Sequence, residues 1–310
     1  MRIAVFGVGG VGGYFGGRLA EAGEDVVFIS RGAHLQAIQR NGLQVESSEG
    51  NFVIEQAQAH EDPAAVGSVD VVLVGVKAWQ VPQAAEAIRP LVGAETVVVP
   101  LQNGVEAPSQ LEAVLGSDHT LGGLCRIISS IVAPGHIRHA GIDPYVAFGR
   151  LDGQHSEGAQ RLRAVFARAK GVRVEIPPDI RMAMWRKFLL IAAWSGLGAI
   201  TRASIGPIRT QPETRQMLKQ ALQEIHAVAV ANHVALPHDA IAETLAFIDS
   251  LPAQGTASMQ RDIIAGRPSE LASQNGAVVR LAHEAGVEVP LHSFIYRSLL
   301  LLEMQARGET

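Results

Sequence analysis

The first thirty residues contain two short apolar runs on either side of a glycine-rich segment. Arg2–Phe6 and Val26–Ile29 are the apolar runs, and residues 10–22 between them have apolar positions at helical spacing. Gly23 follows, and glycine commonly ends a helix at its C-terminus. The pattern predicts a strand, a tight turn, a helix and a second strand.

Apolar runs continue to alternate with helical patterns as far as about residue 175. Val69–Val76 is apolar except for one aspartate, Thr96–Val99 is similar, and Gln83–Leu91 between them has helical spacing. Unbroken apolar runs suit parallel strands that helices cover on both faces, so we predict a doubly wound parallel sheet. Residues 43–59 and 120–150 are expected to add less regular strands.

The pattern changes to consecutive helices after Ile176–Asp179, which is a turn-rich joint. Thr210–Glu213 has the sequence of a capping box and is expected to open a helix that runs through His233. Prolines are expected to open the next three helices, the second of which stops at Gly286. These prolines are Pro237, Pro268 and Pro290.

The predicted elements therefore fall into two domains. We place a mixed α/β domain at residues 1–175 and an all-helical domain at residues 176–310. The chain has 310 residues, of which 47% are apolar, and this is enough to build two hydrophobic cores.

The glycines of the first predicted turn have the spacing of a dinucleotide-binding loop. The first glycine of the loop permits the turn, the second lets a pyrophosphate approach the backbone, and the third lets the helix pack on the strand. The N-terminus of the helix then offers free N–H groups and a positive dipole to the phosphates. The residues expected to form this loop are Gly7, Val8, Gly9, Gly10, Val11 and Gly12.

The residues after the second strand indicate which dinucleotide binds. A site for NAD places Asp or Glu there, to accept a hydrogen bond from the ribose 2′-hydroxyl. This chain has Ser30 and Arg31 instead, and a guanidinium pairs with a 2′-phosphate that a carboxylate would repel. We therefore predict NADP(H) as the cofactor, the alternative being that Arg31 is a solvated surface residue.

Polar residues also follow two later strands. Lys77 comes after Val69–Val76, and Gln102–Gly104 comes after the run that begins at Thr96. In open parallel sheets the ligand lies outside the carboxyl ends of the strands, so these residues are better candidates for function than polar residues on helix faces.

Together these features resemble the ketopantoate reductase family, whose members are also called 2-dehydropantoate 2-reductases. The resemblance extends over nearly the whole chain, and its KAWQ and QNG parts are much more specific than the glycine loop. The segments that carry it are GVGGVG at 7–12, SR at 30–31, VKAWQ at 76–80, LQNG at 101–104, WRKFLL at 185–190, ASM at 257–259 and SE at 269–270. The resemblance implies a Rossmann-type N-terminal domain, a helical C-terminal domain and an active site between them. It also implies NADPH-dependent reduction of a 2-oxo acid to a 2-hydroxy acid on the pantothenate route.

By position, the resemblance makes Lys187 the general acid, and it places Lys77 and Asn103 near both the nicotinamide and the substrate. Ser258 and Glu270 correspond to residues of the substrate pocket. A lysine ammonium can stabilise the negative charge that hydride transfer leaves on oxygen, and it can supply the proton. Glu270 is expected to hold this lysine or to accept from a substrate hydroxyl, and is therefore a second catalytic candidate.

One departure from the family pattern concerns the helix that carries Lys187. The family usually has asparagines one and two helical turns further on, where this chain has Ile191 and Ser195. Residues at these spacings share the face of Lys187, so Ser195 is expected to line the substrate pocket with a short hydroxyl. The substrate is therefore either ketopantoate or a more apolar 2-oxo acid, with Trp194 either beside it or in the core.

The bulk composition argues against several partners. The formal net charge is −4 and no long basic run is present, so we do not expect nucleic acid as a partner. No run approaches the ~20 apolar residues of a membrane span, and Phe188–Ile200 is too short. We see no secretory signal, and the single cysteine, Cys125, allows no internal disulfide. We expect a cytoplasmic protein in which Cys125 is a small strand or turn residue, the alternative being a reactive thiol.

Three interpretations stay open at the level of sequence. The chain is either a 2-oxo acid reductase, a related two-domain dehydrogenase of β-hydroxyacids, or an NADPH-binding sensor without activity. Metal catalysis is not favoured, because the closely spaced histidine pairs lack neighbouring carboxylates or thiols at familiar metal spacing. These pairs are His136 with His139 and His226 with His233. Leu299–Leu302 in the last helix is expected to be core or the contact of a homodimer.

Overall fold

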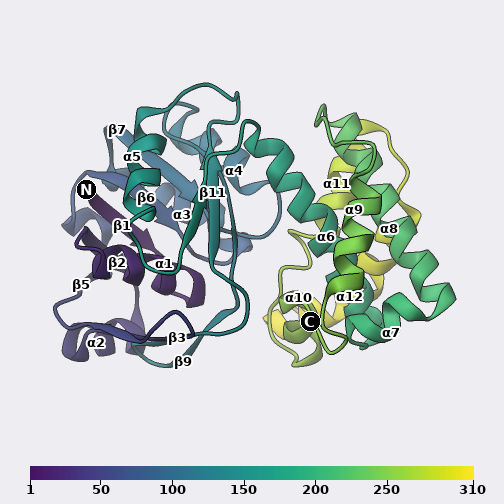
Figure 1. Ribbon diagram of the computed structural model, residues 1–310, viewed down its shortest axis with the longest axis horizontal. Coiled ribbons are helices and arrows are strands. Elements are labelled where there is room, and N and C mark those ends of the chain that lie inside the picture. Colours follow the sequence, from purple (N-terminus) through teal and green to yellow (C-terminus); the bar gives the residue numbers. More distant parts are fainter. The chain divides into compact units, whose positions relative to one another are not determined.

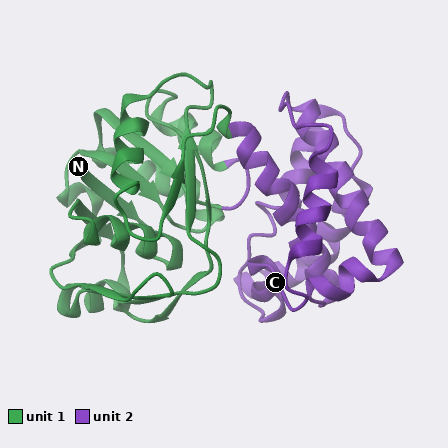
Figure 2. Cartoon of the chain, in the orientation of Figure 1, with its two compact units in different colours: residues 1–102, 107–180 green, residues 103–106, 181–310 purple.

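The computed structural model describes residues 1–310, and its contacts divide the chain into two compact units (Figure 2). Unit 1 comprises residues 1–102 and 107–180, and unit 2 comprises residues 103–106 and 181–310. The units part after Ile180, whereas the sequence suggested an end of the first domain at residue 175. Ile180 belongs to unit 1 because its side chain fills the space beside Gly122 and Gly149, where an added Cβ would meet it at 2.9 Å and 3.7 Å.

Unit 1 contains all the strands of the molecule. They are β1 (Arg2–Phe6), β2 (Asp25–Ile29), β3 (Leu43–Ser47), β4 (Phe52–Ile54), β5 (Gln58–His60), β6 (Val69–Val74), β7 (Val92–Pro100), β8 (Gly122–Arg126), β9 (Ser129–Ala133), β10 (His136–His139), β11 (Tyr145–Gly149) and β12 (Arg173–Glu175). Its helices are α1 (Gly10–Glu21), α2 (Gly32–Asn41), α3 (Val81–Ala87), α4 (Ala107–Leu115) and α5 (Glu157–Phe166), with the short 3-10 turns η1 (Pro63–Ala65), η2 (Ala78–Gln80) and η3 (Arg89–Leu91). The predicted opening of strand, turn, helix and strand is confirmed.

The main sheet has five parallel strands in the order β5-β2-β1-β6-β7 (Figure 1). Alternate residues of β1 point to opposite faces. Ile3 and Val5 pack with α1, α2 and α5, whereas Ala4 packs with α3 and α4. Because helices cover both faces, β6 needs apolar residues at nearly every position, which accounts for the unbroken run in the sequence. The predicted doubly wound parallel sheet is confirmed.

Most of the less regular strands form two smaller sheets, in the orders β4-β3-β10-β9 and β12-β11-β8. Cys125 lies on β8 and is 5% exposed, and its thiol donates to the carbonyl oxygen of Leu101 at 3.4 Å. The only cysteine is therefore a small buried strand residue, as predicted.

The turn between β1 and α1 leaves no room for a side chain at three of its glycines, one of which is Gly10, where an added Cβ would lie 2.6 Å from the carbonyl oxygen of Ser129. Gly7 has a φ of +95°, and a Cβ at Gly12 would lie 2.2 Å from the carbonyl oxygen of Gly7. A Cβ at Gly9 would meet nothing closer than the carbonyl oxygen of Gly75, at 3.9 Å. The fold therefore requires glycine at positions 7, 10 and 12, but it does not require glycine at position 9.

All regular structure of unit 2 is helical, as predicted. Its helices are α6 (Ile180–Thr201), α7 (Ile205–Thr210), α8 (Pro212–Ala231), α9 (Ala240–Ser250), α10 (Ser258–Ile264), α11 (Asn275–Ala285) and α12 (Pro290–Arg307). None of them is long and apolar enough to cross a membrane.

The expected capping box at the start of α8 is wrong. Thr210 ends the preceding helix, and its hydroxyl donates to the carbonyl oxygen of Gly206 at 3.0 Å. Gln211 caps α8 instead, because its side-chain oxygen accepts from the N–H of Thr214 at 2.9 Å. Thr210 therefore belongs to the short helix α7 before α8, which the sequence did not reveal.

The expectation that Pro268 opens a helix is also wrong, because α11 begins only at Asn275. The backbone N–H and the hydroxyl of Ser269 donate to the carboxylate of Glu303 on α12, the hydroxyl at 2.5 Å. This attachment to a distant helix holds residues 268–274 in turns rather than in a helix.

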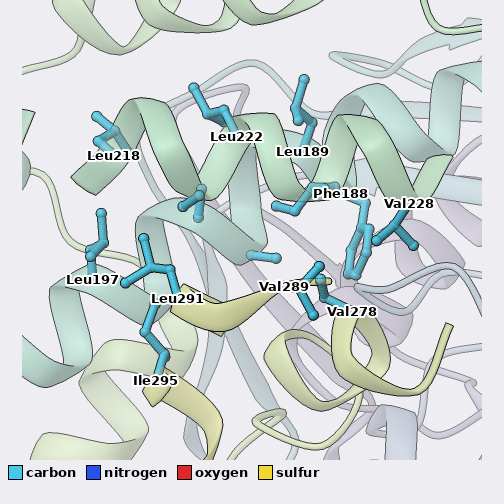
Figure 3. Packing of buried hydrophobic residues seen from close by; sticks show 14 of the residues in the cluster. Phe188, Leu189, Leu197, Leu218, Leu222, Val228, Val278, Val289, Leu291 and Ile295 are labelled. Atoms are coloured by element: carbon cyan, nitrogen blue, oxygen red, sulfur yellow. The ribbon is translucent and has the colours of Figure 1, made fainter. Parts of the chain in front are cut away.

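Helix α6 forms the centre of the core of unit 2. Its Phe188, Leu189 and Leu197 belong to one cluster with apolar residues of α8, α11 and α12 (Figure 3). The other labelled members of this cluster are Leu218, Leu222, Val228, Val278, Val289, Leu291 and Ile295. Nearly all of the circumference of α6 is covered, which explains why its sequence is apolar without a clear polar face.

Two glycines of α6 admit polar side chains from other helices. A Cβ at Gly196 would lie 2.5 Å from the Nδ2 of Asn275, and a Cβ at Gly198 would lie 2.4 Å from the Oε1 of Gln260. Asn275 donates to the carbonyl oxygen of Ala192 at 3.2 Å. The starts of α10 and α11 are thereby fixed against α6.

A buried carboxylate joins α8 to the N-terminus of α12. Glu224 accepts the N–H groups of Leu291 and His292 at 3.0 and 2.9 Å, and its Oε2 lies 2.9 Å from the Nδ1 of His292. Burial raises the pKa of Glu224, but the hydrogen bonds from His292 and Leu291 outweigh it, so this pKa lies below its ordinary value.

We predict that Gly12→Ala and Gly9→Ala differ in stability. The methyl group at position 12 would force α1 away from the turn and lower the free energy of unfolding by about 1–3 kcal/mol. The methyl group at position 9 has space, so its effect should stay within roughly 0.5 kcal/mol. Urea unfolding followed by circular dichroism measures both, and equal losses would contradict this reading of the turn.

We also predict that Glu224→Gln changes how stability depends on pH. A carboxyl whose pKa is lowered by folding stabilises the protein above its unfolded pKa of about 4.5, and this contribution is lost as the pH falls through the lower folded value. The variant should therefore be less stable than wild type by about 1.5–3 kcal/mol at neutral pH. This difference should shrink below about pH 4.5. Urea unfolding across this range tests the prediction, which a pH-independent difference would refute.

Candidate functional site

The glycine loop of unit 1 combines an open backbone with a helix N-terminus. Gly9 is the N-cap of α1, and its carbonyl oxygen accepts the N–H of Gly13 at 2.8 Å. No acidic residue lies in the first turn of α1, so nothing opposes an anion at its positive end. The space beside Gly9 and this helix end together fit a pyrophosphate.

Ser30 and Arg31 lie directly after β2 and lead into α2. The N–H of Ser30 donates to the carbonyl oxygen of His60 at 3.0 Å, and Arg31 is the N-cap of α2. Arg31 is exposed, and its guanidinium makes no hydrogen bond or ion pair within the chain. The first turn of α2 contains no acidic residue. An arginine in this position is available to an anionic ligand.

The segment that carries Lys77 lies against the glycine loop. A Cβ at Gly7 would be 2.7 Å from the backbone nitrogen of Val76, so the two segments touch at the end of the sheet. Lys77 is exposed and is the N-cap of η2, and its Nζ lies 5.8 Å from the centre of the Trp79 ring. The structure thus brings the glycine loop and Lys77 to the same edge, as expected for the carboxyl ends of parallel strands.

Gln102 fixes this edge from within unit 1. It is 7% exposed, and its Nε2 donates to the carbonyl oxygens of Val74 and Val76 at 2.7 and 2.9 Å. Both donors of the amide are used to hold the backbone that leads from β6 to Lys77. Its place directly after an apolar run marked Gln102 as a candidate for function, and the structure gives it this supporting role.

A buried carboxylate in unit 2 brings together three of the predicted site residues. Glu270 is 7% exposed, and its Oε2 accepts from the Nδ2 of Asn103 at 3.0 Å and from the Nε2 of Gln274 at 3.4 Å. The hydroxyl of Ser195 donates to the Oε1 of Gln274 at 2.5 Å. Asn103 thus bonds Glu270 directly, and Gln274, which the sequence patterns did not indicate, joins Ser195 to Glu270 in the same polar network.

Lys187, Ile191 and Ser195 follow one another at single-turn spacing on α6, and the first two are half-buried. Ser195 is fully buried, and its hydroxyl also contacts the carbonyl oxygen of Ile191. The hydroxyl is thus engaged inside unit 2, and its expected contact with a substrate stays a prediction. Trp194 packs against the core, and its indole Nε1 is buried without a hydrogen-bond partner.

Ser258 is the first residue of α10 and is half-buried. Gln260, two residues on, fixes this end of α10 by donating to the carbonyl oxygen of Ala203 at 2.8 Å and accepting the N–H of Ala257 at 3.3 Å. Ser258 is not a member of the network around Glu270. The structure therefore leaves it as a separate candidate.

No group of three or more His, Cys, Asp or Glu side chains is placed to hold a metal ion. His136 lies 3.0 Å from Glu46, and His139 lies 2.8 Å from the hydroxyl of Ser47.

Within the predicted apolar stretch of α12, Leu299 is buried, whereas Leu301 and Leu302 are 58% and 42% exposed. The homodimer expected from this stretch stays a prediction.

Comparison with known proteins relates both parts of the chain to one family. Residues 3–153 match the family model Ketopantoate reductase PanE/ApbA, and residues 179–303 match Ketopantoate reductase PanE/ApbA C terminal. The uncharacterized oxidoreductase YkpB of Bacillus subtilis is 32% identical over 98% of this chain and 100% of that protein. The 2-dehydropantoate 2-reductase of a Nostoc species is 28% identical over 99% of this chain and 96% of its own length.

A solved structure shows the same relationship in three dimensions. The PanE/ApbA family ketopantoate reductase from Ralstonia eutropha is 31% identical to this chain and superimposes with a TM-score of 0.89, covering 99% of this chain and 100% of its own. Its likeness extends through the parallel sheet and the helical region alike. The resemblance seen in the sequence is confirmed, and this chain belongs to the ketopantoate reductase PanE/ApbA family of oxidoreductases.

Proposed function

We propose that this chain uses NADPH to reduce the ketone of a 2-oxo acid to a 2-hydroxy acid. The first candidate substrate is 2-dehydropantoate (ketopantoate), which would give pantoate for pantothenate synthesis, since the Nostoc relative is named for that reaction. The observation that carries the proposal is the environment of Glu270, which is a buried carboxylate. Two amide donors hold one of its oxygens, and the other oxygen has no hydrogen-bond partner within the chain. Such an oxygen is placed to accept a hydrogen bond from a ligand.

The residues of unit 1 fit an NADP(H) cofactor. The open backbone at Gly9 and the N-terminus of α1 would hold the pyrophosphate, and the exposed guanidinium of Arg31 would pair with the 2′-phosphate. When bound, NADPH supplies the hydride that reaches the carbonyl carbon. Lys77 adds a positive charge at the same edge of the sheet.

The residues of unit 2 would carry the acid chemistry. Hydride transfer leaves a negative charge on the carbonyl oxygen, and the ammonium group of Lys187 is our choice to stabilise this charge and donate the proton. Asn103 and Glu270 would orient the substrate by hydrogen bonds, and Ser258 would bind its carboxylate. The half-buried Ile191 on the same helix face as Lys187 also makes a more apolar 2-oxo acid a candidate substrate.

We predict that Arg31→Ala weakens NADPH binding without weakening NADH binding. Losing a charge-assisted contact costs about 1.5–3 kcal/mol, which is about a 10- to 100-fold rise in Kd. Fluorescence titration with NADPH and NADH measures this, with Arg40→Ala at the other, exposed end of α2 as the control. Equal weakening for both cofactors would count against a 2′-phosphate contact.

We predict that Lys187→Ala lowers kcat by about 10²- to 10⁴-fold, because the developing oxyanion loses its proton donor. NADPH oxidation should be followed spectrophotometrically with ketopantoate and with larger, more apolar 2-oxo acids. Lys219→Ala, which changes an exposed lysine of α8, is the matched control and should retain wild-type activity. If wild type binds NADPH but oxidises it with none of these acids, the chain is a sensor and not the proposed reductase.

A further inference from the structure

Gln274 occupies a position between two of the candidate site residues. It is fully buried and lies at the end of the turns that precede α11. One edge of its amide faces Glu270, with Nε2 at 3.4 Å from Oε2, and the other edge faces Ser195, with Oε1 at 2.5 Å from Oγ. Its backbone N–H also donates to the carbonyl oxygen of Glu270 at 2.9 Å, so backbone and side chain both bind the same residue.

The chemistry of the three groups fixes the orientation of this amide. An ionised carboxylate only accepts hydrogen bonds, so the NH₂ edge of Gln274 has to face Glu270. The oxygen edge then needs a donor, and the hydroxyl of Ser195, which shares its single proton between this oxygen and the carbonyl oxygen of Ile191, supplies it. A flipped amide would place its oxygen against the carboxylate, and two acceptors that face each other repel strongly at a site without water contact.

Two amides thus hold the same oxygen of Glu270. Asn103 approaches Oε2 from the segment after β7, and Gln274 approaches it from the turn before α11. The other oxygen, Oε1, has no partner within the chain and is left for a ligand. A carboxylate held at one oxygen by two donors cannot rotate freely, so the direction of Oε1 is set by the pair.

We propose that Gln274 is a positioning residue of this enzyme, and that Ser195 acts through it by orienting its amide. Gln274 directs the free oxygen of Glu270 toward a hydroxyl donor of the substrate, and it does so without contacting the substrate itself. This inference rests on the proposed function, in which Glu270 binds the 2-oxo acid. Ser195 is accordingly a support of the carboxylate rather than a substrate ligand.

A kinetic double-mutant cycle tests the proposal. Gln274→Met keeps the length of the side chain and removes both hydrogen bonds, and Glu270→Gln removes the carboxylate. We expect Gln274→Met to lower kcat/KM for ketopantoate, or for the 2-oxo acid that wild type reduces best, by about ten-fold, equivalent to about 1.4 kcal/mol. In the Glu270→Gln background the Gln274→Met change should have almost no further effect on kcat/KM, because the carboxylate that Gln274 holds is already gone.

Two further variants keep the test informative if Gln274→Met folds poorly. Ser195→Ala removes only the hydroxyl, and we expect a smaller loss, about three-fold, that also vanishes in the Glu270→Gln background. Gln220→Met is the matched control, because Gln220 also donates to a glutamate four residues away, Glu224, at 3.1 Å on α8. It should leave kcat/KM unchanged.

The outcomes separate this proposal from the proposed function. Losses that are abolished in the Glu270→Gln background support the positioning role. Losses that are equally large with and without the carboxylate show that Gln274 is a structural residue only, and they overturn the inference while leaving the reductase function intact. A wild type that oxidises NADPH with no 2-oxo acid overturns the function, and the inference with it.

Discussion

The candidate site depends on the need to compensate one buried negative charge. Glu270 is 7% exposed, and a carboxylate in such a place is tolerated only when hydrogen-bond donors replace the water it has lost. Asn103 and Gln274 supply these donors from two separate segments of the chain. The turns at residues 268–274, the start of α11 and the segment after β7 are therefore held in a common arrangement around this group.

The core of unit 2 makes that arrangement rigid. Helix α6 is covered on nearly all sides, and glycines at positions 196 and 198 let the amides of Asn275 and Gln260 lie against its backbone. The helix that begins at Ser258 and the helix that follows Glu270 are consequently fixed to the helix that carries Lys187. Packing and polar contacts thus act on the same residues, which is what a precisely oriented site requires.

In the proposed function unit 1 has a different task, which is to receive the pyrophosphate of the cofactor without presenting a side chain to it. The glycine loop does this through backbone geometry, and Gln102 supports it by holding the backbone between β6 and Lys77. Arg31 stands exposed after the neighbouring strand. These features agree with the membership of the chain in a family of reductases.

The sequence by itself determined the sheet, the glycine turn and the family, because these depend on local patterns of apolar residues, glycines and short motifs. It also indicated Asn103, Glu270 and Ser195 singly. The tertiary structure decided that they form one network, because Asn103 bonds Glu270 directly and Gln274 joins Ser195 to Glu270 from a turn that Ser269 and Glu303 hold out of the expected helix. Contacts between residues so far apart in the chain leave no periodic signal, and only the packed structure reveals them.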